Sequence, residues 1–303
     1  MRILAVVFQI LTLFMLTGSG AFLRRKQILT EPVIHGINAS VLAVAWPALV
    51  IMSTQKQLSA GNLDGFFRIL LYATLLMAGV SAVLMAACKG RTEENKRSVF
   101  VALCALPNTG FVGIPLVRAF YGDEGLAYLA GYIVAFNLVL WTQYVLIFGG
   151  KQANPFRAAL NISVLAAVCA VLLLVFQVRI PEPFASFFDQ LASLTTPLSM
   201  ILLGARLKES LNIKQILDRT LLSAVGIRLL LFPLLAYGVM RAMGIHGMEL
   251  GVMVMASAMP CASVGQMFAE KYHKDVGFAA QGISLSLILC VFTIPFILWM
   301  TGL

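Results

Sequence analysis

Long apolar runs separated by short polar connections dominate the pattern of this chain. Ten runs have roughly the 20 residues that a helix, rising about 1.5 Å per residue, needs to cross a hydrocarbon core about 30 Å thick. The predicted spans are 3–23, 33–53, 66–87, 98–119, 125–148, 158–178, 184–205, 220–241, 248–269 and 276–300. Such continuous runs are not typical of the alternating strands of a membrane barrel. We therefore predict an all-α membrane protein with ten transmembrane helices, forming a single domain over residues 1–303.

Two of these spans contain a proline beside polar residues, in ALPNTGFVGIP at 105–115 and AMPCASVG at 258–265. Pro107 and Pro260 are separated by about half of the 303-residue chain, and Pro47 and Pro197 show nearly the same separation. Landmarks that keep their order and spacing predict an internal duplication, with halves of approximately 1–150 and 151–303. Each half has an odd number of spans, so the second half enters the membrane in the opposite orientation. The repeats are then inverted, with broken helices four and nine crossing.

Breaking a helix inside the membrane leaves ends with unpaired backbone groups and about half an elementary charge each. Two amide-rich ends, about 4 Å from a carboxylate at an effective dielectric near 20, supply on the order of 4 kcal/mol. Desolvation of the carboxylate costs a comparable amount, so useful affinity needs a directly placed donor. Asn108 and Thr109 are in position to provide one. Ser263 and Gln266 follow the second break and either coordinate the solute or satisfy the backbone.

Composition agrees with a membrane protein, since 60% of the residues are hydrophobic and 12% are charged. The net charge of +9 does not indicate nucleic acid, because the basic residues are sorted by side of the membrane. Fifteen of the 22 lie in the loops after spans one, three, five, seven and nine, and six lie on the opposite side. By the positive-inside rule, both termini face outward.

Arg228 is the one remaining basic residue, and it lies inside span eight. An arginine at the bilayer centre costs about 2.5–3.5 kcal/mol on an insertion scale, so it should face protein or water. It either neutralises an anion, meets a carbonyl or snorkels to the basic side, and its proximity to Thr220 favours snorkelling.

The first span resembles a signal peptide in its small residues at 18–21, but its charges argue against cleavage. A signal peptide carries its positive cluster before the apolar region. Here Arg24, Arg25 and Lys26 come after it, so we expect a retained first span.

The sequence gives little evidence for a metal site, a cofactor site or an intramembrane enzyme. The five cysteines include no CxxC pair and no histidine stands at metal-ligand spacing, so neither a metal nor a cofactor is expected. An intramembrane enzyme is disfavoured because the spans lack paired aspartates, a Ser–His pair or HExxH. A membrane receptor or a channel stays open as an alternative.

The sequence does not identify what drives transport. Asp189 and Glu270 lie near span ends, and no carboxylate falls securely in the middle of a span. Transport driven by the anion gradient or membrane potential, or coupled to protons, stays open, and sodium is disfavoured.

The segment ALPNTGFVGIPL at 105–116 closely resembles the fourth-span crossover of the auxin efflux carrier family, which includes plant PIN-FORMED transporters and bacterial relatives. The resemblance extends over the full chain, to LLGARL at 202–207 and to MPCASVGQMFAEKY at 259–272. It implies a ten-helix elevator-type carrier in a bacterial inner membrane. The implied substrate is a small organic anion bearing a carboxylate, such as malate or malonate. A homodimer is compatible with this picture.

Individual residues can be carried over from this resemblance. Asn108 matches the crossover asparagine that contacts the substrate carboxylate, and Pro107 and Pro260 match the crossover prolines. Asn137 matches a polar site residue of span five more loosely, and tying helices together is its alternative role. The predicted substrate-binding residues are Asn108, Thr109, Asn137, Cys261 and Ser263. This chain departs from the plant pattern after Pro260, where Cys261-Ala262 and Gly265 replace a second proline, and this leaves the substrate's identity open.

Overall fold

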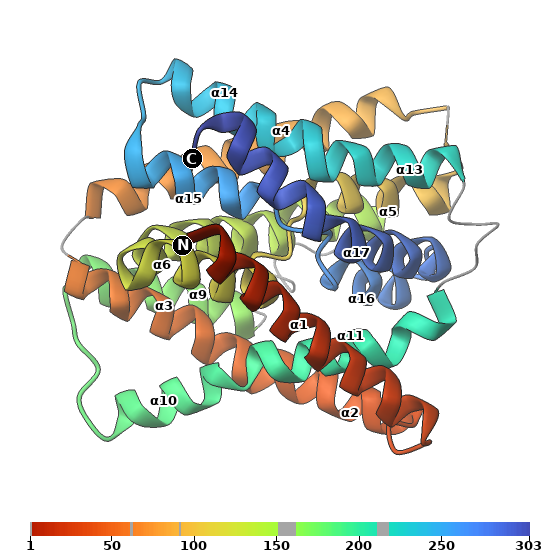
Figure 1. Cartoon of the computed structure of the whole chain (residues 1–303), viewed down its shortest axis with the longest axis horizontal. Helices are drawn as coiled ribbons and strands as arrows, with labels where there is room; N and C mark the ends of the chain where they lie inside the picture. Colours follow the sequence, from red (N-terminus) through yellow and green to blue (C-terminus); the bar gives the residue numbers. More distant parts are fainter. Residues whose placement is uncertain (1, 61–62, 91, 151–161, 211–217) are drawn as a thin grey trace.

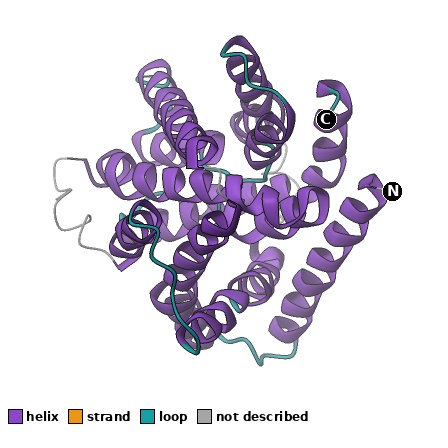
Figure 2. Cartoon of the chain, turned by 90° about the vertical axis from the view of Figure 1, so that its left-hand side faces the viewer, coloured by secondary structure: helices purple, strands orange, loops and turns teal. Residues whose placement is uncertain are grey.

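The computed structural model describes residues 2–60, 63–90, 92–150, 162–210 and 218–303, which are helical apart from their connections (Figures 1 and 2). The helices are α1 (Arg2–Arg25), α2 (Glu31–Ser40), α3 (Trp46–Ala60), α4 (Leu63–Ala87), α5 (Glu94–Ala105), α6 (Ile114–Val139), α7 (Val145–Gly149), α9 (Ile162–Val175), α10 (Phe184–Ser193), α11 (Thr195–Ser210), α13 (Arg219–Gly226), α14 (Phe232–Ala242), α15 (Gly247–Ser257), α16 (Val264–Lys271) and α17 (Val276–Thr301). Most described residues of every predicted span are helical, and residues 158–161 of the sixth span lie outside the described residues. The all-α prediction is confirmed.

Five described helices are both long and apolar enough to cross a membrane. They are Glu31–Gln55, Leu63–Ala87, Thr109–Gly149, Arg219–Ala242 and Val276–Thr301. Large apolar side chains also cover the outside of the molecule, and on α17 Phe292 is 73% and Trp299 is 77% exposed. Extended apolar surface of this kind is a liability in water and suits contact with lipid.

Three helical segments contain a π-helical turn that ends two residues before a proline. The turns are Val41–Ala45 before Pro47, Thr109–Gly113 before Pro115 and Ile227–Leu231 before Pro233. A proline has no N–H to donate, and its ring collides with the carbonyl four residues earlier. A wider turn displaces that carbonyl, so the helix continues past the proline.

At Pro107 and Pro260 the helix instead breaks. Leu106 is extended, with φ −96° and ψ 108°, which is the geometry that a following proline favours. The chain resumes as a helix at Thr109 after the first break and at Val264 after the second. In Figure 1, α5 and α16 lie on one side of the centre and α6 and α15 on the other, so the two interrupted helices cross.

The two breaks are joined by a pair of backbone hydrogen bonds. Asn108 N–H donates to the Pro260 carbonyl at 2.8 Å, and Ala262 N–H donates to the Leu106 carbonyl at 2.9 Å. The result is an isolated antiparallel bridge between Pro107 and Cys261. Groups that each break would leave unpaired in the membrane therefore satisfy one another.

Away from the crossing, α1 packs closely on α11 (Figure 1). Gly20 of α1 lies against the carbonyl of Ile201, and Gly204 of α11 lies against the carbonyl of Thr17. The contact is reciprocal, backbone to backbone, as in membrane helix pairs that use small residues to approach closely. Helix α3 also packs on α9.

Replacing Gly20 tests the α1–α11 contact. A Cβ at this position would collide with the Ile201 carbonyl oxygen, so Gly20→Ala should lower the free energy of unfolding by about 1–3 kcal/mol. Gly18→Ala is the matched control, because nothing lies within 4 Å of its Cβ position. Thermal unfolding of both variants in detergent measures the difference, and equal stabilities would contradict the described contact.

Candidate functional site

A cavity of about 80 Å³ lies where the two breaks face α2, α3 and α11. A single ordered water needs roughly 10–15 Å³ of such space, so the cavity has room for a small solute. The breaks and the helices that follow them supply Pro107, Asn108, Thr109, Gly110, Ser263, Gln266 and Glu270. The facing wall supplies Ile34, Asn38, Trp46, Ser199, Leu202 and Leu203.

Asn108 is the most informative residue of the lining. Its backbone is fixed on both sides, because its N–H donates to Pro260 and its carbonyl accepts from Val112 N at 3.1 Å. Its side chain is 4% exposed, yet within the described structure its Nδ2 donor has no hydrogen-bond partner. Leaving such a donor unpaired costs about 1–3 kcal/mol. An acceptor in the cavity would recover part of this cost.

Two hydroxyl groups, of Thr109 and Ser263, lie near Asn108 in the cavity lining. Thr109 Oγ1 donates to the Pro107 carbonyl at 3.3 Å, while Ser263 Oγ is buried without a partner among the described residues. Both line the cavity, as the sequence predicts. The helices after the breaks begin at Thr109 and Val264, so two helix N-termini, with their partial positive charge, also meet there.

Trp46 forms an aromatic wall that the sequence analysis did not identify. Its indole Nε1 donates to Asn137 Oδ1 at 3.1 Å, and its ring meets Phe111 edge-on at 5.2 Å between centroids. Gly110 lies so close to this ring that a Cβ there would collide with it. The indole is therefore held between Asn137 and the turn after the first break.

Asn137 does not line the cavity. It is fully buried, and it uses its oxygen for Trp46 and its Nδ2 for the Ile133 carbonyl at 2.8 Å. The structure thus gives Asn137 the helix-tying role that the sequence left open, in place of direct contact with a solute.

Cys261 also turns away from the cavity. Its Sγ donates to the Leu103 carbonyl at 3.2 Å, and its N–H donates to Ser286 Oγ at 3.0 Å. The reason is the extended bridge with Pro107, in which adjacent side chains point in opposite directions. The expectation that the Cys261 side chain contacts the solute needs this correction.

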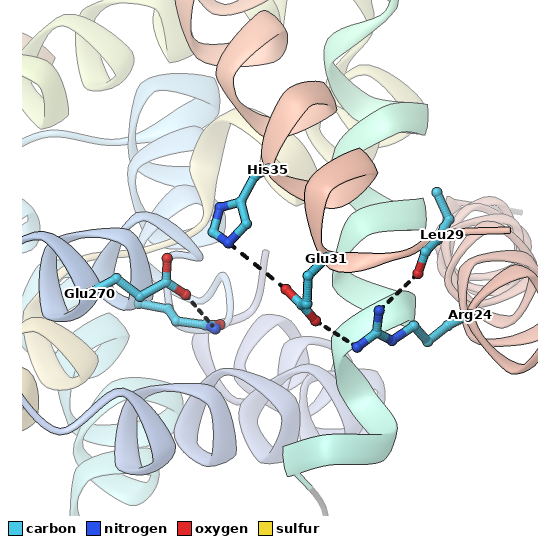
Figure 3. A network of polar contacts seen from close by, with 6 residues as sticks. Arg24, Leu29, Glu31, His35 and Glu270 are labelled. Carbon is cyan, nitrogen blue, oxygen red and sulfur yellow. Dashed lines mark hydrogen bonds and ion pairs between the residues drawn. The ribbon is translucent and has the colours of Figure 1, made fainter. Parts of the chain in front are cut away.

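Among the described residues that line the cavity, Glu270 is the one with a charged side chain. Gln266 Nε2 donates to Glu270 Oε1 at 3.2 Å. Figure 3 shows Glu270 facing α2, where Glu31 lies 3.8 Å from His35 Nε2 and 2.6 Å from Arg24. The spacing of Ser263, Gln266 and Glu270 places them on one helical face, a signal present in the sequence.

Arg228 does not snorkel. Its side chain is fully buried, Nη1 donates to the Cys104 carbonyl at 3.3 Å, and Nη2 donates to the Ser257 carbonyl. The Phe232 ring lies 3.9 Å from the guanidinium carbon. The π-helical turn that contains Arg228 directs it toward the two breaks, so the expectation of snorkelling is wrong.

Enlarging Gly110 tests how Trp46 is held. Gly110→Ala should displace the indole and weaken its bond to Asn137, with a loss of about 1–3 kcal/mol in the free energy of unfolding. Gly265→Ala, beside the other break, is the control because its Cβ would meet only Ala102, at 3.8 Å. Thermal unfolding and acrylamide quenching of tryptophan fluorescence report the two effects. Indistinguishable variants would contradict the packing of Trp46.

Comparison with known proteins places this chain in a family. The family model described as membrane transport protein matches residues 5–158 and 152–298. A relative named an uncharacterized transporter, from Methanothermobacter thermautotrophicus, is 28% identical over 96% of both chains. The uncharacterized transporter MJ1031 of Methanocaldococcus jannaschii is 24% identical over 91% of this chain and 92% of its own. The uncharacterized transporter YfdV of Escherichia coli is 25% identical over 92% of each chain.

These matches cover nearly the whole chain and confirm the family resemblance found in the crossover sequences. The protein is a multi-pass membrane transporter and not an enzyme. It belongs to the membrane transport protein family, the family of the auxin efflux carriers.

Proposed function

We propose that this chain is a secondary transporter of small organic anions in a bacterial inner membrane. The observation that carries the proposal is the buried Nδ2 donor of Asn108, which has no hydrogen-bond partner among the described residues, on a residue that lines a cavity where two helices begin. Helix N-termini and an amide donor suit a carboxylate. Small dicarboxylates such as malonate or malate are the first substrates to test.

The position of the cavity supports an elevator mechanism. One wall belongs to the crossing helices together with Phe136, Leu140 and Trp141 of the fifth predicted span, and the other to α2, α3 and α11. A site between two groups of helices can be exposed to either side of the membrane when one group slides past the other. The crossing helices carry Asn108 and Ser263 and would move with the bound anion.

The packing of the outer helices supports two inverted halves, 1–150 and 151–303. A twofold axis in the membrane plane would exchange the first predicted span with the sixth and the second with the seventh. The contact of α1 with α11 would then become the contact of α9 with α3, and both contacts occur. In the proposed topology both termini face the periplasm.

Replacing Asn108 tests the site directly. Asn108→Ala should weaken malonate binding about 10- to 150-fold, the equivalent of the roughly 1.5–3 kcal/mol of a hydrogen bond to a charged group. Protein stability should not fall, because Asn108 Nδ2 has no partner to lose among the residues that the structure describes. Isothermal titration and thermal unfolding of the purified protein measure the two quantities.

Asn137→Ala is the matched control, since this amide is satisfied within the protein. It should lower stability through the lost Trp46 bond. If Asn108→Ala binds malonate like the unaltered protein, Asn108 is not a ligand. Counterflow of radiolabelled malonate in liposomes separates a carrier from a receptor or a channel, because only a carrier gives saturable exchange.

Replacing Glu270 tests whether the substrate is negatively charged. Its carboxylate adds a negative charge to the lining, so Glu270→Gln should strengthen malonate binding about fivefold, the equivalent of ~1 kcal/mol. Binding of neutral malonamide should not change with the same substitution. Titration of both compounds measures the contrast, and weaker malonate binding by the variant would argue against an anion site.

A further inference from the structure

Arg228 occupies the point where the two helices that precede the breaks come to an end. Its guanidinium donates to the carbonyl of Cys104, in the last turn of α5, and to the carbonyl of Ser257, the last residue of α15. One side chain from a third span thus caps both helix C-termini. The two N-termini across the breaks remain directed at the cavity.

The charge of Arg228 is balanced by these helix ends. Among the residues that the structure describes, no carboxylate forms an ion pair with Arg228. A helix C-terminus carries about half a negative elementary charge, so two of them sum to roughly one. A guanidinium keeps its positive charge in proteins, and the cluster is close to neutral. The Phe232 ring stacked on the guanidinium adds a cation–π contact.

The same helix ends are where transporters with broken helices commonly hold a coupling cation, using the carbonyls of half-helix C-termini. In this chain, a metal ion at that position would meet the resident guanidinium and compete for its two carbonyl oxygens. We propose that Arg228 is a built-in substitute for a coupling cation, and that anion transport needs no co-transported metal ion. The transport part of this inference rests on the proposed function.

The unaltered protein provides the first test. Malonate counterflow in liposomes should change less than twofold when sodium and potassium are replaced on both sides by N-methylglucamine. A loss of more than tenfold that sodium restores would overturn the inference while supporting anion transport. Absence of malonate exchange in every buffer would contradict the proposed function instead, and the second test then decides the role of Arg228.

The second test uses thermal unfolding and needs no substrate. Arg228→Ala leaves two carbonyls without their cation, and millimolar guanidinium or methylguanidinium should raise its unfolding temperature by several degrees. Arg241→Ala, on the same predicted span but exposed, is the control and should show no such rise. If guanidinium leaves Arg228→Ala unaffected, or stabilises both variants equally, the cation-substitute role is wrong.

A pair of milder variants separates charge from packing. Arg228→Lys keeps a positive charge and Arg228→Gln removes it, while both keep a long polar side chain. Without metal ions, the lysine variant should exchange malonate at least tenfold faster than the glutamine variant, and sodium should stimulate only the glutamine variant. Equal rates would assign Arg228 a merely structural role and overturn the inference.

Discussion

The structure depends on one interaction, the pair of backbone hydrogen bonds that joins the two breaks. In hydrocarbon, an interrupted helix is tolerated only where its freed backbone groups find partners. Here each break supplies a donor and an acceptor to the other, through Asn108 with Pro260 and Ala262 with Leu106. The bonds fix the register of the crossing and hold both prolines together. The positions of the cavity, of Asn108 and of the four helix ends all follow from this register.

The crossing also separates charge. The negative ends of α5 and α15 meet Arg228, whereas the helices that begin at Thr109 and Val264 present positive ends to the cavity. The described lining contains no basic side chain. The proposed attraction for an anion would therefore come from oriented amides and hydroxyls. Because dipole attraction and desolvation nearly cancel, the proposed binding would depend on the Asn108 donor, which has no partner among the described residues.

Several features of the fold and the site could be predicted from the sequence because they are local. A proline disfavours helical geometry at the residue before it, and Pro107 and Pro260 also stand beside polar residues, so these two breaks could be predicted from the sequence. Asn108 and Ser263 follow as neighbours of the breaks. The directions of Cys261, Asn137 and Arg228 were not predictable in this way. They depend on an extended bridge, on a partner 91 positions away and on a π-helical turn, and none of these follows from apolar periodicity.

The distribution of contacts also bears on how the proposed elevator would keep hold of its solute. Asn108, Thr109, Ser263 and the capping residue Arg228 all belong to the crossing helices or contact them directly. The facing wall is largely apolar, with Ile34, Leu202 and Leu203 beside Asn38 and Ser199. Apolar contacts are non-directional, so they can slide without losing specific bonds. The directional bonds would travel with the crossing helices, and a bound anion would therefore keep its main ligands throughout the movement.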